Sequence, residues 1–154
     1  MSKVSNKRDT KQRLDIMSDP IYFMSATALA SAIASRDLSV TEVMTAFLRR
    51  IEEVNPKVNA IVTLCADEAI RQAAEMDKTR SSQDAKPLYG LPIAIKDLVP
   101  TRGIRTTFGS PIYANFVPDF DELFVSRLKE AGAIVIGKTN TPEFGAGSQT
   151  FNPV

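Results

Sequence analysis

Any chemistry in this sequence depends on lysine, carboxylate, hydroxyl or thiol groups, because its 154 residues include no histidine. That absence excludes Ser-His-Asp and Cys-His catalysis and every imidazole base or ligand. Lys96 is the strongest candidate for a proton acceptor. It follows the apolar run of residues 91–95, which predicts a strand buried on both faces, and open parallel sheets place their ligand sites where such strands end. Burial disfavours the ammonium form of a lysine, so a neutral amine could accept a proton there.

Position alone leaves two alternatives open for Lys96. The side chain either acts as a base or extends from the end of the strand into solvent without a catalytic role. Asp97 follows it and is predicted to point to the opposite face of the strand. We expect its carboxylate to accept hydrogen bonds that hold the loop after the strand.

Residues 132–139, Gly-Ala-Ile-Val-Ile-Gly-Lys-Thr, match the phosphate-loop pattern of nucleotide-binding proteins. A phosphate loop needs a strand before its first glycine, a loop at its central positions and a helix after its lysine. Here the central residues 133–136 predict a strand, a helix is predicted before Gly132, and Pro142 follows soon after. The context is inverted, so a nucleotide-binding module is the least favoured interpretation of the chain.

Composition excludes several classes of partner. Lysine and arginine number 19 against 18 aspartate and glutamate residues, and beyond the N-terminal tail the two signs are interspersed, so neither nucleic acid nor a membrane surface is an expected partner. No apolar run approaches the ~18 residues that span a bilayer. We predict that the single cysteine, Cys65, is a small core residue. A lone cysteine is also typical of a protein in a reducing, cytoplasmic compartment. No metal-binding spacing is present, and we expect neither a metal nor a cofactor.

The hydrophobic pattern predicts one α/β unit over residues 21–154 behind a loose polar leader, residues 1–20. Helices are predicted from Ser25 to about Ile33, from Ser39 to Asn55 and from Ala66 to about Arg80. Strands are predicted over residues 60–64, 91–96 and 133–136. A further helix is expected to begin at Asp119 or Asp121, to end at Gly132 and to turn Leu123, Phe124, Leu128 and Ala131 inward. Strand, helix and strand in this order predict a right-handed crossover in a largely parallel sheet.

Three blocks of the chain resemble the opening part of the amidase signature family. They are Gly-Leu-Pro-Ile-Ala-Ile-Lys-Asp at residues 90–97, Asp-Glu-Leu-Phe-Val-Ser-Arg-Leu-Lys-Glu-Ala-Gly-Ala at 121–133, and Gly-Lys-Thr-Asn-Thr-Pro-Glu-Phe at 137–144. With the helices before them, the similarity covers about residues 25–154. The resemblance implies an incomplete amidase signature fold, with N-terminal helices followed by part of a mixed, largely parallel sheet flanked by helices.

The resemblance also implies a function, the hydrolysis of a carboxylic amide by a Ser, cis-Ser, Lys triad. Lys96 matches the family's lysine. The family's two serines lie in a Gly/Ser-rich segment that this sequence does not contain, so we expect the chain to be inactive alone. Ser110 lies in no such segment and is not expected to be a nucleophile. The family's substrate pocket runs beside the stretch that matches Gly145, Ala146, Gly147 and Ser148, which are therefore candidate lining residues.

The expected partner is a small-molecule amide, and a homo-oligomer is compatible with the sequence. The block at residues 141–145 is more like that of general amidases acting on small or aryl amides than like that of the tRNA-dependent amidotransferase branch. A different alternative is a non-catalytic subunit that completes the fold in trans with a serine-bearing chain.

Overall fold

A computed structural model describes residues 20–79 and 86–154 of the chain. The predicted leader, apart from Pro20, lies outside the described residues. The helices are α2 (Ala26–Ser35), α3 (Val40–Val58), α4 (Ala66–Thr79) and α5 (Leu123–Glu130), with short 3₁₀ turns η1 (Ile21–Phe23), η2 (Pro111–Tyr113) and η3 (Glu143–Gly145). The strands are β1 (Ile61–Leu64), β2 (Pro92–Lys96) and β3 (Ile134–Thr139).

The three described strands form one mixed sheet in the order β1-β3-β2. β2 and β3 run parallel and are joined through α5, whereas β1 pairs with β3 in the antiparallel direction. This arrangement confirms the predicted α/β class. β3 is buried along almost its whole length, because it has a neighbour on each side and helices over both faces.

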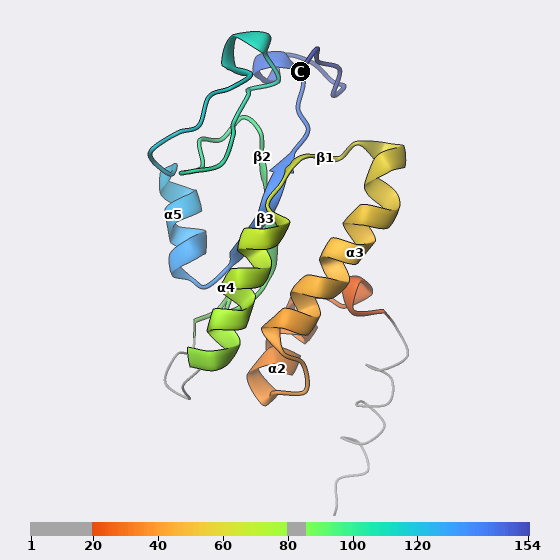
Figure 1. The fold of residues 1–154 in the computed structure, drawn as a ribbon, viewed down its shortest axis with the longest axis vertical. Coiled ribbons are helices and arrows are strands. Elements are labelled where there is room, and N and C mark those ends of the chain that lie inside the picture. The colour runs from red at the N-terminus through yellow and green to blue at the C-terminus, as the bar shows by residue number, and fades with distance from the viewer. Residues whose placement is uncertain (1–19, 80–85) are drawn as a thin grey trace, which may run out of the picture.

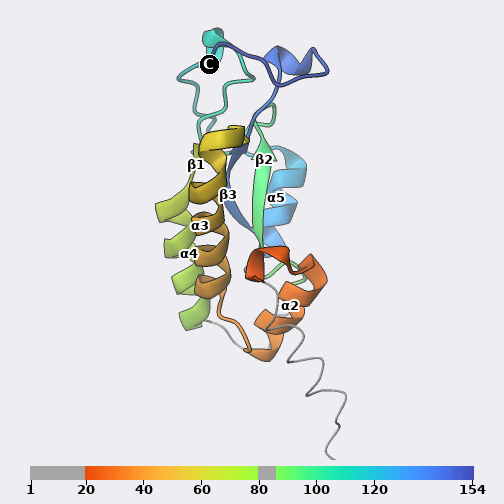
Figure 2. The same cartoon turned by 90° about the vertical axis from the view of Figure 1, so that its right-hand side faces the viewer.

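Helices cover the two faces of the sheet unequally (Figure 1). Figure 2 shows α3 and α4 on one side of the strands and α5 on the other. The larger core cluster lies under α2, α3 and α4 and contains Leu29, Ile33, Val40, Val43, Met44, Ala69, Ala73, Leu91, Ile134 and Ile136. The smaller one, under α5, contains Ile95, Val125 and Val135. Alternate residues of β3 therefore enter different clusters, as the two-residue period of a strand requires.

A capping box opens α3. Ser39 Oγ accepts a hydrogen bond from the backbone N–H of Glu42 at 3.1 Å, and the backbone N–H of Ser39 donates to Glu42 Oε2 at 2.8 Å. The bond from Ser39 lowers the pKa of the Glu42 carboxyl. The first N–H groups of a helix have no partner within the helix, so these bonds supply what the helix lacks.

Replacing Ser39 by alanine removes one of these partners and is expected to lower the free energy of unfolding by about 1 kcal/mol. Urea unfolding followed by circular dichroism measures the loss. Ser31→Ala, at an exposed site inside α2, is the control and should change stability by no more than about 0.5 kcal/mol. Equal stabilities of the two variants would contradict the capping role.

Three local expectations were wrong. α3 does not end at Asn55 but continues through Pro56 to Val58, because the C-cap is Asn59, which lies in the left-handed region and closes the helix by donating its N–H to Asn55 O. α5 buries Val125 while Leu123 and Phe124 are exposed, because Val125 and Leu128, three residues apart, share the face that packs against Ile95 and Val135 of the sheet.

The third correction concerns β2. It was expected to be buried on both faces, but it lies at the edge of the described sheet and most of its residues are only half-buried. β3, not β2, is the central strand.

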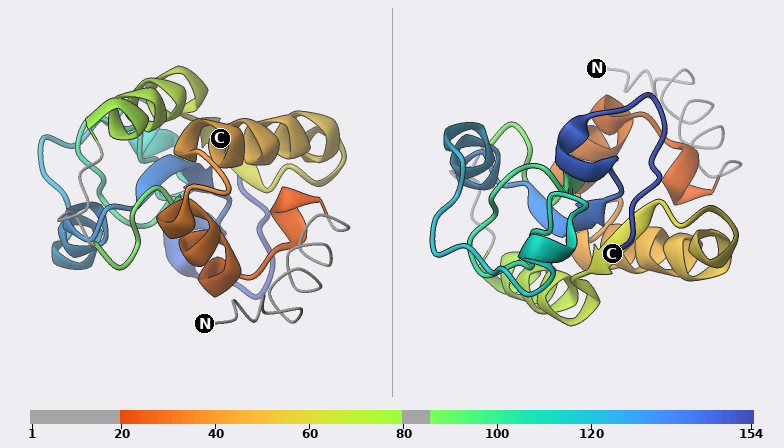
Figure 3. Two further views of the ribbon diagram at one scale, coloured as in Figure 1. Left: turned by 90° about the horizontal axis from the view of Figure 1, so that it is seen from below. Right: turned by 90° about the horizontal axis from the view of Figure 1, so that it is seen from above.

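Loops gather at the carboxyl ends of β2 and β3. Figure 1 places the segment that follows β2 and the C-terminal segment together beyond these ends, and the view from above in Figure 3 shows them side by side. None of the helices in the described part of the chain is both long and apolar enough to cross a membrane. The sheet therefore presents its parallel carboxyl ends to a cluster of loops, the usual place for a ligand site in such sheets.

Candidate functional site

Lys96 is the last residue of β2 and lies at the carboxyl edge of the sheet, as predicted. Its side chain is exposed, so the expectation of a sequestered lysine was wrong for the described residues. β2 lies at the edge of the described sheet, so no described strand lies beyond it. The structure thus confirms the place of Lys96 but not its predicted burial.

Asp97 holds the loop after β2, as predicted. Its carboxylate accepts the backbone N–H of Thr107 at 3.1 and 3.2 Å and the Thr107 hydroxyl at 2.5 Å. The side chain of Asp97 is buried, opposite in exposure to its neighbour Lys96. The backbone joins the same two points again, because the N–H of Phe108 donates to Asp97 O at 2.9 Å. The hydrogen bonds from Thr107 and Phe108 to Asp97 therefore join the two ends of this loop and close it into a ring.

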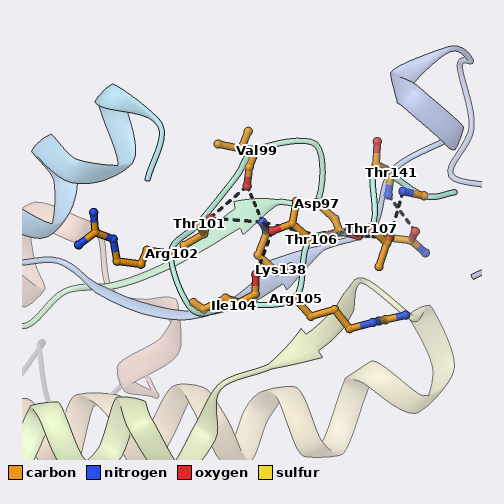
Figure 4. Close-up of polar contacts among 12 residues, drawn as sticks. Asp97, Val99, Thr101, Arg102, Ile104, Arg105, Thr106, Thr107, Lys138 and Thr141 are labelled. Carbon is orange, nitrogen blue, oxygen red and sulfur yellow. Dashed lines mark hydrogen bonds and ion pairs between the residues drawn. The ribbon is translucent and has the colours of Figure 1, made fainter. Parts of the chain in front are cut away.

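Lys138 occupies the middle of this ring (Figure 4). Its side chain is fully buried, and its Nζ donates to Val99 O at 2.6 Å, to Thr106 Oγ1 at 2.7 Å and to Thr101 Oγ1 at 3.3 Å. The Asp97 carboxylate lies 3.9 Å away. A buried ammonium is thus surrounded by three neutral acceptors and one negative charge.

Burial lowers the pKa of Lys138 from 10.5 to about 8, and the nearby charge of Asp97 opposes part of that shift. Desolvation disfavours the charged form of any buried amine, which explains the direction. The residue keeps its proton at neutral pH in the folded chain. Its charge is therefore present in the site under ordinary conditions and is costly to bury.

Replacing Lys138 by methionine is expected to change how stability depends on pH. Between the folded-state value of about 8 and the ordinary 10.5 the unfolded chain binds more protons, so the free energy of unfolding rises with pH in that window. Below it both states are charged and the full cost of burial remains. The stability of the wild type relative to Lys138→Met should increase by about 2–3 kcal/mol from pH 7 to pH 10.

Urea unfolding of both proteins at the two pH values measures this difference. Cys65, whose pKa burial raises, is present in both proteins. A stability difference that does not vary with pH would contradict the lowered pKa of Lys138.

The four candidate lining residues, Gly145, Ala146, Gly147 and Ser148, lie on the exposed C-terminal segment. The structure brings Gly145 close to the loop after Lys96, since a Cβ at Gly145 would lie 2.8 Å from Leu98 Cδ1. The segment is also tied to the same loops by the N–H of Phe144, which donates to Phe108 O at 2.7 Å. No hydrogen bond joins Ser148 to Lys96 in the described part of the chain. The lining role of these four residues remains a prediction.

Two further side chains of nucleophile type among the described residues, Ser110 and Cys65, are not presented for attack. Ser110 is fully buried at the start of η2, and its Oγ has no hydrogen-bond partner among the described residues. Cys65 is half-buried rather than in the core and lines a groove of about 980 Å³ between α4 and α5 that Lys96 does not reach. Because burial raises the pKa of its thiol, Cys65 is not an activated nucleophile.

The phosphate-loop match is a coincidence of letters. β3 contains residues 134–139, so the positions that would cradle a phosphate are extended and buried, and a 3₁₀ turn rather than a helix follows them. Lys138, the lysine of the match, is turned into the loop network. These findings agree with the prediction that residues 132–139 form no nucleotide site.

The network around Lys138 was not predicted from the sequence. The signal was present, because a lysine inside a buried strand needs acceptors, and Thr101, Thr106 and Thr107 lie together in the preceding loop. The phosphate-loop pattern, which contains the same lysine, concealed it.

Comparison with known proteins now gives the family. The family model described as Amidase matches residues 42–154. The chain belongs to the amidase family. Among its relatives, the A subunit of the glutamyl-tRNA(Gln) amidotransferase from Carboxydothermus hydrogenoformans is 44% identical over 86% of this chain and 27% of the relative. The corresponding protein of Syntrophobacter fumaroxidans is 42% identical over 85% and 27%. The chain thus spans about a quarter of the length of these curated amidase relatives.

Solved amidase structures share the fold. The peptide amidase from Stenotrophomonas maltophilia is 33% identical, with a TM-score of 0.74 over 81% of this chain and 26% of that one. A fatty acid amide hydrolase is 26% identical, with a TM-score of 0.80 over 94% and 26%. The identities to amidotransferase subunits exceed those to these hydrolases, so they give no support to the preference for general amidases drawn from residues 141–145.

Proposed function

We propose that this chain supplies the proton-accepting lysine, Lys96, of an amide-hydrolysing site. In this proposal the amine accepts the proton of a serine nucleophile through a second serine hydroxyl, and the proton later passes to the amine leaving group. Neither serine is among the 154 residues, so the chain alone does not hydrolyse amides. Gly145 to Ser148 line the pocket for a small-molecule amide, and the site works in the cytoplasm without a metal or cofactor.

One observation carries the proposal. Lys96 ends a strand at the parallel carboxyl edge of the sheet of an amidase-family chain, in the block that resembles the family's lysine block. Because a neutral amine is favoured by burial, the proposal requires the serine-bearing part of the site to cover the side chain of Lys96, which is exposed in this chain. Asp97, directly after it, is fixed by three hydrogen bonds and thereby holds the strand end in place.

The experiment is a reconstitution. The chain is fused to, or expressed with, the part of one of the amidotransferase relatives that lies beyond the aligned segment, and turnover of glutamine and of a chromogenic aryl amide is measured. Circular dichroism and gel filtration establish that the assembly is folded. We expect turnover from the assembly and none from the chain alone. Turnover by the chain alone would overturn the proposal.

A second candidate, that the chain is a non-catalytic part completing a fold in trans, has one observation in its favour. Large apolar side chains at Val117, Phe120, Leu123 and Phe124 are exposed close together in sequence. Such side chains are typical of surfaces that another chain or segment covers. A stable complex with a serine-bearing chain whose turnover does not depend on Lys96 would favour this candidate over the first.

A further inference from the structure

Lys138 has the largest side chain among the fully buried ones of the described residues. Burying an ammonium costs free energy, and an apolar residue of similar volume in its place is often neutral or stabilising. The cost is visible here, because burial lowers the pKa of Lys138 despite the nearby Asp97. Packing of the sheet therefore does not explain why a lysine stands at this position.

The hydrogen bonds offer an explanation. All three acceptors of Lys138 belong to the stretch of chain that leaves β2 just after Lys96, namely Val99, Thr101 and Thr106. The two threonine hydroxyls donate elsewhere, Thr101 to Val99 O and Thr106 to Ile104 O, each at 3.1 Å. Their lone pairs are therefore free to accept from Nζ. An ammonium carries three N–H donors and a neutral amine only two, so three acceptors match the charged form.

The same network reaches both neighbours of Lys96. Ile95 lies opposite Lys138 in the β2–β3 pairing, and the Asp97 carboxylate lies 3.9 Å from Lys138 Nζ. The backbone of Lys96 is bonded into the loop as well, since its carbonyl accepts the N–H of Val99 at 3.0 Å, and Val99 O in turn accepts from Lys138. Figure 4 shows Lys138 pointing into this loop, with Asp97, Val99, Thr101 and Thr106 around its end.

We propose that Lys138 is a positioning residue for Lys96. Its ammonium holds the loop of residues 97–107 in place through the three hydrogen bonds. These bonds fix the path of the chain after β2 and thereby the direction in which the side chain of Lys96 points. The effect on the loop is independent of catalysis, whereas its meaning for turnover rests on the proposed function of Lys96.

Amide hydrogen exchange in the whole 154-residue chain tests the effect on the loop. In Lys138→Met, the amides of Val99, Thr107 and Phe108 should exchange at least about tenfold faster than in the wild type, because their bonds lie in the loop that the ammonium holds. Amides of α3 and of the β2–β3 ladder should change by less than about twofold. Lys57→Met, at an exposed site in the last turn of α3, is the matched control and should leave all of these rates unchanged.

Unchanged loop exchange in Lys138→Met would overturn the proposal, as would equal acceleration throughout the sheet and α3, which would make Lys138 only a stabilising residue. If Lys138→Met does not fold, Thr106→Val provides the test, since it removes the 2.7 Å acceptor while keeping the ammonium and the shape of the side chain. It should accelerate the same loop amides selectively, and no selective acceleration would overturn the proposal.

The reconstituted assembly gives a second readout that a purely structural role would not move. A misplaced base lowers kcat, by up to about 10²-fold, and leaves KM within about twofold. Equal turnover in Lys138→Met and the wild type would overturn the positioning role. The two proposals fail in different ways. Insensitivity of turnover to Lys96 removes the proposed function but not the loop result, whereas unchanged loop exchange removes only the role of Lys138.

Discussion

Replacing Lys96 by methionine in an amide-hydrolysing assembly that contains this chain is expected to lower kcat by about 10²–10⁴-fold. Methionine keeps the approximate length of the side chain and removes its only group that can accept a proton. Lys96 is exposed at the end of an edge strand, so the replacement disturbs no packed core and should leave the fold intact. Steady-state kinetics on a small amide measure the loss.

Lys57→Met is the matched control for this prediction, because Lys57 is also an exposed lysine but lies in α3, away from the carboxyl edge of the sheet. Its turnover should stay within about twofold of the wild type. A Lys96→Met assembly that retains more than about a tenth of the wild-type kcat would contradict general-base catalysis by this residue.

Replacing Gly137 by valine is expected to destabilise the chain by about 4 kcal/mol or more, enough to unfold many small domains. Gly137 lies in the central strand β3, opposite Leu64 of β1 and Ala94 of β2. A Cβ there would overlap the carbonyl oxygen of Thr63 and come within 3.0 Å of Ile61 Cγ2. The carbonyl belongs to the backbone of β1, so it could yield only if the β1–β3 pairing opened.

Thermal and urea unfolding of Gly137→Val measure this effect. The control is Gly147→Val, on the exposed C-terminal segment, where the nearest atom to a new Cβ is Pro142 Cβ at 3.3 Å. That change should cost no more than about 1 kcal/mol. A Gly137→Val chain that unfolds at the same urea concentration as the wild type would show that β1 does not pair with β3 as described.

Local patterns predicted most elements of the fold because their causes are local. The Ser39 capping box, the three-four spacing of apolar residues in α3 and α4, and Gly132 after α5 each depend on bonds or conformations within one turn. The parallel pairing of β2 and β3 followed from the strand, helix, strand order. The order of the strands did not follow, because nothing in an apolar run distinguishes an edge strand from a central one, and so the predicted burial of Lys96 was wrong.

The candidate site shows the same division. The place of Lys96 at the end of β2 and the loop-holding role of Asp97 were predicted from their position after an apolar run. The place of Lys138 was not, since its acceptors lie 32 to 39 residues away along the chain and meet it only when the loop folds back over β3. In the sequence, a long-range polar network is visible only as a local composition, here the cluster of threonines after β2. That composition does not indicate which distant side chain the threonines bind.

The proposed catalysis depends on the ability of Lys96 to take up a proton, and turnover of a Lys96→Arg assembly at neutral pH tests it most directly. Arginine carries a positive charge but does not give up its proton in proteins, so it can supply the electrostatic effect of a cation at this position but cannot act as a base. We expect a kcat below about 1% of the wild type, with circular dichroism unchanged. A kcat within about threefold of the wild type would contradict a base at this position, because a permanently protonated side chain cannot accept the proton of a serine.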